Sequence, residues 1–149
     1  MARGHLASTK PQVICICLVL SGCGVRVLVH DQKAAATSAE QFARAAFVAK
    51  DLKAAYAMLA PQARQSVTQA AFPDTLAKMH PKGHPDEVSA VEYETLPGQA
   101  GMYIYLKGRG AAEDFYYRML MVGDKVSGYR VSFLGRGSAA YPPSNRRPL

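Results

Sequence analysis

The spacing of apolar residues divides the chain into a helical half and a strand half. Between residues 37 and 79, apolar side chains recur every three or four positions, the period of an α-helix with one buried face. After residue 87 the period changes to two, which is typical of strands with one buried face. This order predicts an α+β domain in which N-terminal helices pack on a curved antiparallel sheet of about four strands.

The first helix is expected to begin at Thr37, because Thr37 and Glu40 have the spacing of a capping box. Its apolar stripe continues until Pro61 ends the pattern. Asp51 interrupts the stripe, and we expect this residue to cap a second short helix. The stripe is formed by Phe42, Ala45, Ala46, Ala49, Leu52, Tyr56 and Leu59.

A third helix is expected after Thr68, whose hydroxyl can cap it, and Pro73 fits within its first turn. The apolar residues of its buried side are Phe72, Leu76 and Met79. Residues 80–86 contain two prolines and a glycine, so this span is predicted to be a loop.

Four strands are expected after that loop, separated by turn residues. Their expected spans are residues 87–95, 102–107, 115–122 and 126–134. The pair Gly123-Asp124 has the composition of a two-residue hairpin turn between the last two strands. Residues 136–149 contain three prolines and are expected to form a flexible tail.

The N-terminus has the layout of a bacterial export signal. Arg3 and Lys10 supply positive charge, and an unbroken run of eight apolar residues follows at positions 13–20. Eight helical residues cover about 12 Å of a hydrocarbon core about 30 Å thick. The run is therefore too short to be a permanent membrane anchor.

The tetrapeptide Leu20-Ser21-Gly22-Cys23 resembles the lipobox of bacterial lipoproteins. The resemblance implies cleavage after Gly22 and diacylation of the Cys23 sulfur, which would anchor the protein in a membrane. Residues 1–22 are then a signal peptide, 23–36 a lipidated tether and 37–135 the folded domain. A buried N-terminal helix or an ordinary signal peptide is the alternative.

The implied location is the bacterial cell envelope. Gly24 follows the cysteine at the position where, in enterobacteria-like sorting, an Asp favours retention in the inner membrane. We therefore expect the outer membrane, facing the periplasm, rather than the inner membrane.

Residues Phe42 through Ala60, with Asp51 at the start of a second helix, and the closing Gly128-Tyr129-Arg130-Val131 resemble the NTF2-like superfamily. This cystatin-like, cone-shaped α+β fold is shared by nuclear transport factor 2 and the ketosteroid isomerases. The resemblance implies a cone that can enclose a small apolar ligand. No diagnostic motif accompanies it, so it concerns fold more than function.

The charge of the chain is modestly basic. The net charge is +7, and removal of Arg3 and Lys10 with the signal leaves 16 basic and 11 acidic residues, a net charge of +5. These residues are dispersed, whereas nucleic-acid-binding proteins cluster them, so no nucleic-acid partner is expected. Lys107, Arg118 and Arg130 fall on successive strands, either as a basic stripe or as a solvated face.

Few residues offer catalytic or metal-binding chemistry. The side chains of His80, His84 and Asp86 are suitable zinc ligands. However, two prolines and a glycine lie between them in the sequence, and a fourth ligand is not evident. We therefore expect neither a metal nor a cofactor. There is no Gly-x-Ser-x-Gly elbow, and Gly108-Arg109-Gly110 lacks the following helix that would bind phosphate.

Tyrosines are frequent, and in a cone they could direct hydrogen bonds at a ligand. The candidates are Tyr56, Tyr103, Tyr105, Tyr117 and Tyr129. Isomerase-like catalysis also needs a carboxylate opposite such a donor, and we expect Glu92 and Glu94 to point away from the interior. We interpret the tyrosines as core and sheet packing.

The expected function is that of a non-enzymatic envelope lipoprotein. Its lipid on Cys23 would bind the membrane, and its domain would bind an envelope protein or a cell-wall component. The alternative is a small-molecule binder or isomerase-like enzyme that uses the cone.

Overall fold

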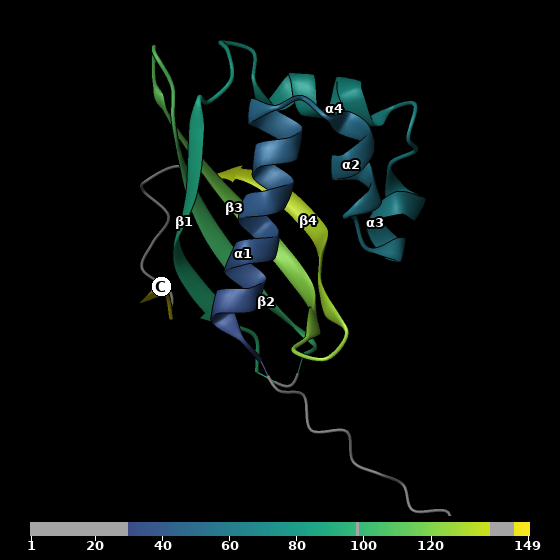
Figure 1. Cartoon of the computed structure of the whole chain (residues 1–149), viewed down its shortest axis with the longest axis vertical. Coiled ribbons are helices and arrows are strands. Elements are labelled where there is room, and N and C mark those ends of the chain that lie inside the picture. The colour runs from purple at the N-terminus through teal and green to yellow at the C-terminus, as the bar shows by residue number, and fades with distance from the viewer. Residues whose placement is uncertain (1–29, 98, 138–144) are drawn as a thin grey trace, which may run out of the picture.

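The expected class, with helices on one face of an antiparallel sheet, is confirmed by the computed structural model (Figure 1). The structure describes residues 30–97, 99–137 and 145–149. The helices are α1 (Gln32–Ala43), the π-helical segment η1 (Arg44–Val48), α2 (Leu52–Ala57), α3 (Pro61–Ser66) and α4 (Phe72–Met79). The strands are β1 (Glu87–Thr95), β2 (Gly101–Arg109), β3 (Asp114–Asp124), β4 (Gly128–Gly137) and β5 (Arg147–Pro148). They form one open sheet in the order β4-β3-β2-β1-β5.

Helix α1 begins earlier than its sequence predicts. The Asp31 carboxylate caps the helix by accepting a hydrogen bond from the Ala34 amide at 3.0 Å. The expected capping box is wrong, because the Thr37 hydroxyl donates to the Lys33 carbonyl and the Glu40 carboxylate accepts from a β1 amide. Residues 32–36, expected in the tether, therefore belong to α1. Burial of its alanine stripe against the sheet explains the earlier start, since Ala35 and Ala36 lie in the core.

The predicted break after η1 is confirmed. Lys50 has a φ of 56°, and the Asp51 carboxylate accepts from the Ala54 amide at 3.0 Å to start α2. Helix α3 was not expected, because Pro61 was taken to end the apolar pattern. The first residue of a helix donates no hydrogen bond within the helix, so the missing N–H of proline costs nothing there. Pro61 therefore begins a helix. The expected cap of α4 by Thr68 is wrong, because Ala71 is the N-cap and no side chain caps the helix. The Thr68 hydroxyl instead accepts from the Ala71 amide in the turn before α4.

The four expected strands are confirmed by β1 to β4. The predicted turn between the last two strands is wrong. Gly123 and Asp124 belong to β3, and residues 125–127 form the turn. The Asp124 carboxylate accepts from the amides of Val126 and Ser127 at 2.9 and 2.7 Å. This side-chain capping stabilises a three-residue loop in place of the two-residue turn that the composition predicted.

The prediction of a flexible C-terminal tail is also wrong for the described residues of that segment. Strand β4 continues to Gly137, and β5 pairs with Glu92 and Tyr93 of β1. The Arg146 guanidinium lies 4.4 Å from the centre of the Tyr105 ring, which fixes the start of β5 on the sheet face away from the helices. Residues 138–144 lie outside the described residues, as do residues 1–29 with the lipobox and Cys23.

The core lies between the helices and the sheet. The two-residue period predicted for the second and third strands is confirmed, since alternate apolar residues of β2 and β3 are almost fully buried. Among the described residues, the largest fully buried side chains are Phe42, Phe47, Val88, Met102, Ile104, Leu106, Tyr117, Met119, Met121 and Val131. Burying each contributes about 1.5–3 kcal/mol. None of the helices in the described part of the chain is long and apolar enough to cross a membrane.

Candidate functional site

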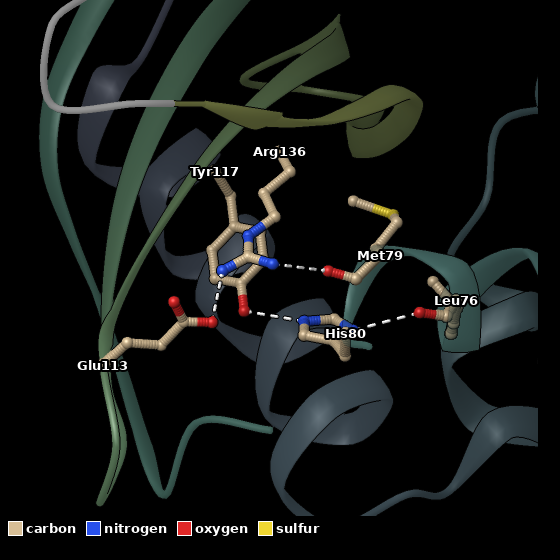
Figure 2. A network of polar contacts seen from close by, with 6 residues as sticks. All are labelled: Leu76, Met79, His80, Glu113, Tyr117 and Arg136. Atoms are coloured by element: carbon tan, nitrogen blue, oxygen red, sulfur yellow. Dashed lines mark hydrogen bonds and ion pairs between the residues drawn. The ribbon is translucent and has the colours of Figure 1, made fainter. Parts of the chain in front are cut away.

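A buried polar cluster lies beyond the C-terminal end of α4 (Figure 2). His80 is 5% exposed, and its Nδ1 lies 3.0 Å from the Leu76 carbonyl oxygen. Because a carbonyl oxygen only accepts, Nδ1 carries the proton. The opposite nitrogen, Nε2, therefore accepts from the Tyr117 hydroxyl at 2.7 Å. Both nitrogens of a neutral imidazole are thus satisfied inside the protein.

Burial keeps both partners of this hydrogen bond uncharged. It lowers the pKa of His80, and the positive charges of His84 and Arg136 lower that pKa further, against the opposing effect of the Leu76 carbonyl. Burial likewise raises the pKa of Tyr117 above its ordinary value. Proton transfer between them would create two buried charges. The pair is therefore suited to holding the fold rather than to moving a proton.

Arg136 extends the cluster to three elements. Its Nη2 donates to Glu113 between β2 and β3 at 2.8 Å, and its Nη1 donates to the Met79 carbonyl of α4 at 3.1 Å. The guanidinium also lies 5.0 Å from the centre of the Phe115 ring. The two hydrogen bonds tie the end of α4 to β4 and to the β2–β3 turn, as Figure 2 shows.

The residues considered for metal binding do not converge as ligands. The rings of His80 and His84 stack with centroids 4.7 Å apart, and both nitrogens of His80 are already hydrogen-bonded. Among the described residues, no group of three or more His, Cys, Asp or Glu side chains is placed to hold a metal ion.

The five tyrosines do not share one site. Tyr117 points into the cluster, whereas the Tyr129 hydroxyl accepts from the Asp31 amide at 2.8 Å at the other end of the sheet. The Tyr105 hydroxyl donates to Glu94 at 2.8 Å. Tyr105 alternates with core residues of β2, so this pair of residues lies on the face away from the helices.

The remaining two tyrosines also have separate partners. Tyr56 donates to the Val67 carbonyl at 3.1 Å, and Tyr103 lies 4.9 Å from the Arg118 guanidinium. The tyrosines thus pack the core and the sheet surface, and they do not surround one cavity.

The three basic side chains on successive strands do not form one stripe. Lys107 pairs with Asp114 at 2.9 Å, and Arg118 lies over aromatic rings. Arg130 reaches across the edge of β4 and donates to the Ala57 carbonyl at 3.0 Å. Each charge is held by a different partner.

An apolar pocket of about 150 Å³ lies between α3, α4 and β4. Hydroxyls of Ser66, Thr75 and Ser132 supply its polar side chains, and no acidic residue or tyrosine lines it. The other lining residues are Phe42, Leu59, Ala63, Val67, Phe72, Leu76, Met79, Val131, Phe133 and Leu134. Sequence reasoning missed this pocket because it missed α3. The signal that could have found it is Pro61, a residue typical of a helix start.

Contacts close the pocket at both ends. At one end Leu59 forms a parallel bridge with Val131, and the Ala60 amide donates to the Val131 carbonyl at 2.7 Å. At the other end Arg136 donates to Met79. Between these contacts the edge of β4 is open. Within the described chain, residues 132–137 make no backbone hydrogen bonds apart from those with β3.

No known protein family model matches this chain, and searches of curated proteins and of solved structures find no similar protein. The fold and the site by themselves define the class. It is an α+β domain that has an open five-stranded antiparallel sheet, a buried polar cluster and a small apolar pocket.

Proposed function

We propose that this protein is a lipoprotein of the bacterial cell envelope whose domain is a non-enzymatic binding module with an NTF2-like fold. Its lipobox supports the anchor, and its helices packed on one face of an antiparallel sheet support the fold. The outer membrane, facing the periplasm, is the proposed location, since Gly24 follows the lipidated cysteine.

The observation that carries the binding role is the chemistry of the pocket. A catalytic acid or base must lie within hydrogen-bond reach of the reacting group. The pocket has no carboxylate, histidine or tyrosine in its lining. The neutral His80–Tyr117 pair is instead enclosed among core aromatic rings. This pocket therefore offers a surface for binding without the groups that an isomerase-like reaction needs.

The size of the pocket also favours the binding module over the small-molecule alternative. Pockets for drug-sized ligands have volumes of roughly 300–1,000 Å³. A volume of about 150 Å³ instead suits one large side chain or a benzene-sized molecule.

The start of α1 shortens the proposed tether. Asp31 lies eight residues after Cys23, so the fully extended tether reaches about 28 Å at most. Helix α1 begins at the same end of the domain as the β3–β4 turn, and α4 lies toward the opposite end (Figure 1). In the proposed arrangement, the β3–β4 turn faces the bilayer and α4 lies farther from it.

Fatty-acid labelling tests the anchor. Cys23→Ala should abolish labelling and leave an unprocessed precursor. Cys17→Ala is the matched control, because this cysteine lies in the apolar run and its loss should leave labelling intact. Continued labelling of the Cys23→Ala protein would contradict the proposal.

Photo-crosslinking in the native bacterium tests the binding role. Benzoylphenylalanine is placed in the full-length protein at Phe133, an aromatic residue that lines the pocket and is 46% exposed on β4, and separately at Val91, which is 40% exposed on β1. A specific adduct with an envelope component is expected at one position or both. Absence of adducts at both positions would count against the binding role.

A further inference from the structure

The open edge of β4 forms one wall of the apolar pocket. Ser132, Phe133 and Leu134 line the pocket, and they belong to the segment whose backbone pairs only with β3 within the described chain. From these features we infer that β4 and the pocket receive an extended acidic segment of another protein. The segment would add a strand to the sheet and place one large apolar side chain in the pocket. This inference rests on the binding function proposed above and specifies its partner.

The edge itself favours an extended peptide. Unpaired strand edges recruit other strands, and proteins usually block them with charges, prolines or covering segments. The open stretch of β4 between the two closing contacts reads Ser-Phe-Leu-Gly, with neither charge nor proline. The chain already makes one such pairing, because Leu59 forms a parallel bridge with Val131 at the end of this stretch. A partner strand would continue along the edge from there.

The pocket favours one anchoring side chain. Its walls combine Phe72 and Leu76 of α4 with Val131 of β4, and Phe42 of α1 contributes from the core. A volume of about 150 Å³ with apolar walls matches a leucine- or phenylalanine-sized group. Anchors of this kind, seated in a water-excluding pocket, supply much of the affinity of protein interfaces.

The surrounding charge favours an acidic partner. The three elements that form the pocket carry four basic residues and one acidic residue, Asp74. The basic residues are Arg64, Lys78, Arg130 and Arg136. Arg136 is paired with Glu113, and the other three outnumber Asp74, so the helices and the strand that form the pocket carry a net positive charge. Acidic residues on both sides of an apolar anchor would complement this surface.

A photoreactive peptide tests the inference. The probe is acetyl-Asp-Val-photoleucine-Val-Asp-amide, added to the processed full protein extracted from membranes. Mass spectrometry should find adducts on pocket residues, with at least about tenfold less labelling after Thr75→Phe fills the pocket. Ala77→Phe, on an exposed position of the same helix outside the pocket, should leave labelling unchanged.

Charge variants give a second readout that does not depend on filling the pocket. A probe with Lys in place of both Asp residues should label several-fold less. Lys78→Glu should weaken labelling by the acidic probe, whereas Lys33→Glu on α1 should not. Labelling that resists Thr75→Phe, or that falls on the opposite sheet face, would overturn the inference. Crosslinks from the pocket to a second copy of this chain would overturn it as well.

The cellular crosslinks separate this inference from the proposed function. Adducts from Val91 without adducts from Phe133 would leave the binding function standing and overturn the β4 site. Absence of adducts from both positions would overturn both.

Discussion

Helix α4 borders two regions of opposite character. Beyond its C-terminus lies the polar cluster, in which both nitrogens of His80 are hydrogen-bonded and Arg136 bonds to two elements. Along its side lies the apolar pocket, beside a strand edge that pairs only with β3 within the described residues. The polar side chains of the cluster are thus hydrogen-bonded within the fold. The apolar pocket has no charged, histidine or tyrosine side chain in its lining.

The difference has a physical origin. A buried polar group without a partner costs about 1–3 kcal/mol, so a folded chain must satisfy the groups that it buries. Once satisfied, such groups hold elements together and have little capacity left for a ligand. An apolar pocket carries no such requirement and can stay available for binding.

The largest expected effect comes from removing the central ring of the cluster. Tyr117 is 1% exposed and stacks on Phe47 with centroids 4.8 Å apart. Tyr117→Ala should lower the free energy of unfolding by about 3–5 kcal/mol, because it leaves a cavity in the core. Denaturant unfolding measures this loss. The neighbouring Tyr116→Ala, on the other sheet face, should cost less than about 1 kcal/mol. Equal losses would contradict the assignment of the two faces.

A smaller effect is expected from removing only the hydroxyl. Tyr117→Phe keeps the ring and leaves His80 Nε2 without its donor, so the free energy of unfolding should fall by about 1–3 kcal/mol. The same unfolding measurement applies. Unchanged stability would show that the hydrogen bond between Tyr117 and His80 does not stabilise the fold.

The pH dependence of stability should follow His80, which is buried, and His84, which is partly buried. Burial lowers the pKa of His80 and of His84 in the fold, so the unfolded chain binds protons more readily. The free energy of unfolding should therefore be steady above about pH 6.5 and fall below it, by up to about 1.4 kcal/mol per pH unit for one proton.

His80→Asn tests which group is responsible for this pH dependence. The charged groups around the His80 ring are His84, Arg136 and Glu113, and Lys50 acts on His84. The slope of stability against pH below about pH 6.5 should become smaller in the variant. Parallel pH profiles for the variant and the natural protein would be inconsistent with a buried neutral His80.

The smallest expected effect is a gain in stability at the pocket. Ala63→Leu adds apolar volume inside the pocket and should raise the free energy of unfolding by about 0.5–1 kcal/mol. Ala77→Leu, outside the pocket on the exposed side of α4, should change it by less than about 0.5 kcal/mol. A loss of stability in Ala63→Leu would mean that the pocket is already filled.

The fold was largely predictable because local periodicity determines which face of each element is buried. The alternation in residues 102–107 and 115–122 predicted two strands that each bury one face, as β2 and β3 do. The start of α1 was not predictable, since it depends on the packing of Ala35 against the sheet, a contact distant in sequence. The same holds for β5, whose pairing with β1 joins segments more than fifty residues apart.

The site was less predictable than the fold. Sequence reasoning singled out His80 and Tyr117 without placing them together, because a hydrogen bond between residues 37 positions apart leaves no local pattern. It passed over Ala63 and Thr75 altogether. These two residues carry no distinctive chemistry, and they line a pocket only because α3 and α4 lie beside β4.

The most direct test of this division compares one pocket variant with one cluster variant. The measurement is the dissociation constant of the acidic photoleucine peptide for Thr75→Phe and for Tyr117→Phe, alongside the stability of each protein. Thr75→Phe should weaken binding by at least about tenfold while its stability stays close to that of the natural protein. Tyr117→Phe should lose stability and keep its affinity for the peptide. Equal binding by the two variants, or loss of binding in Tyr117→Phe alone, would contradict the separation of a structural cluster from a binding pocket.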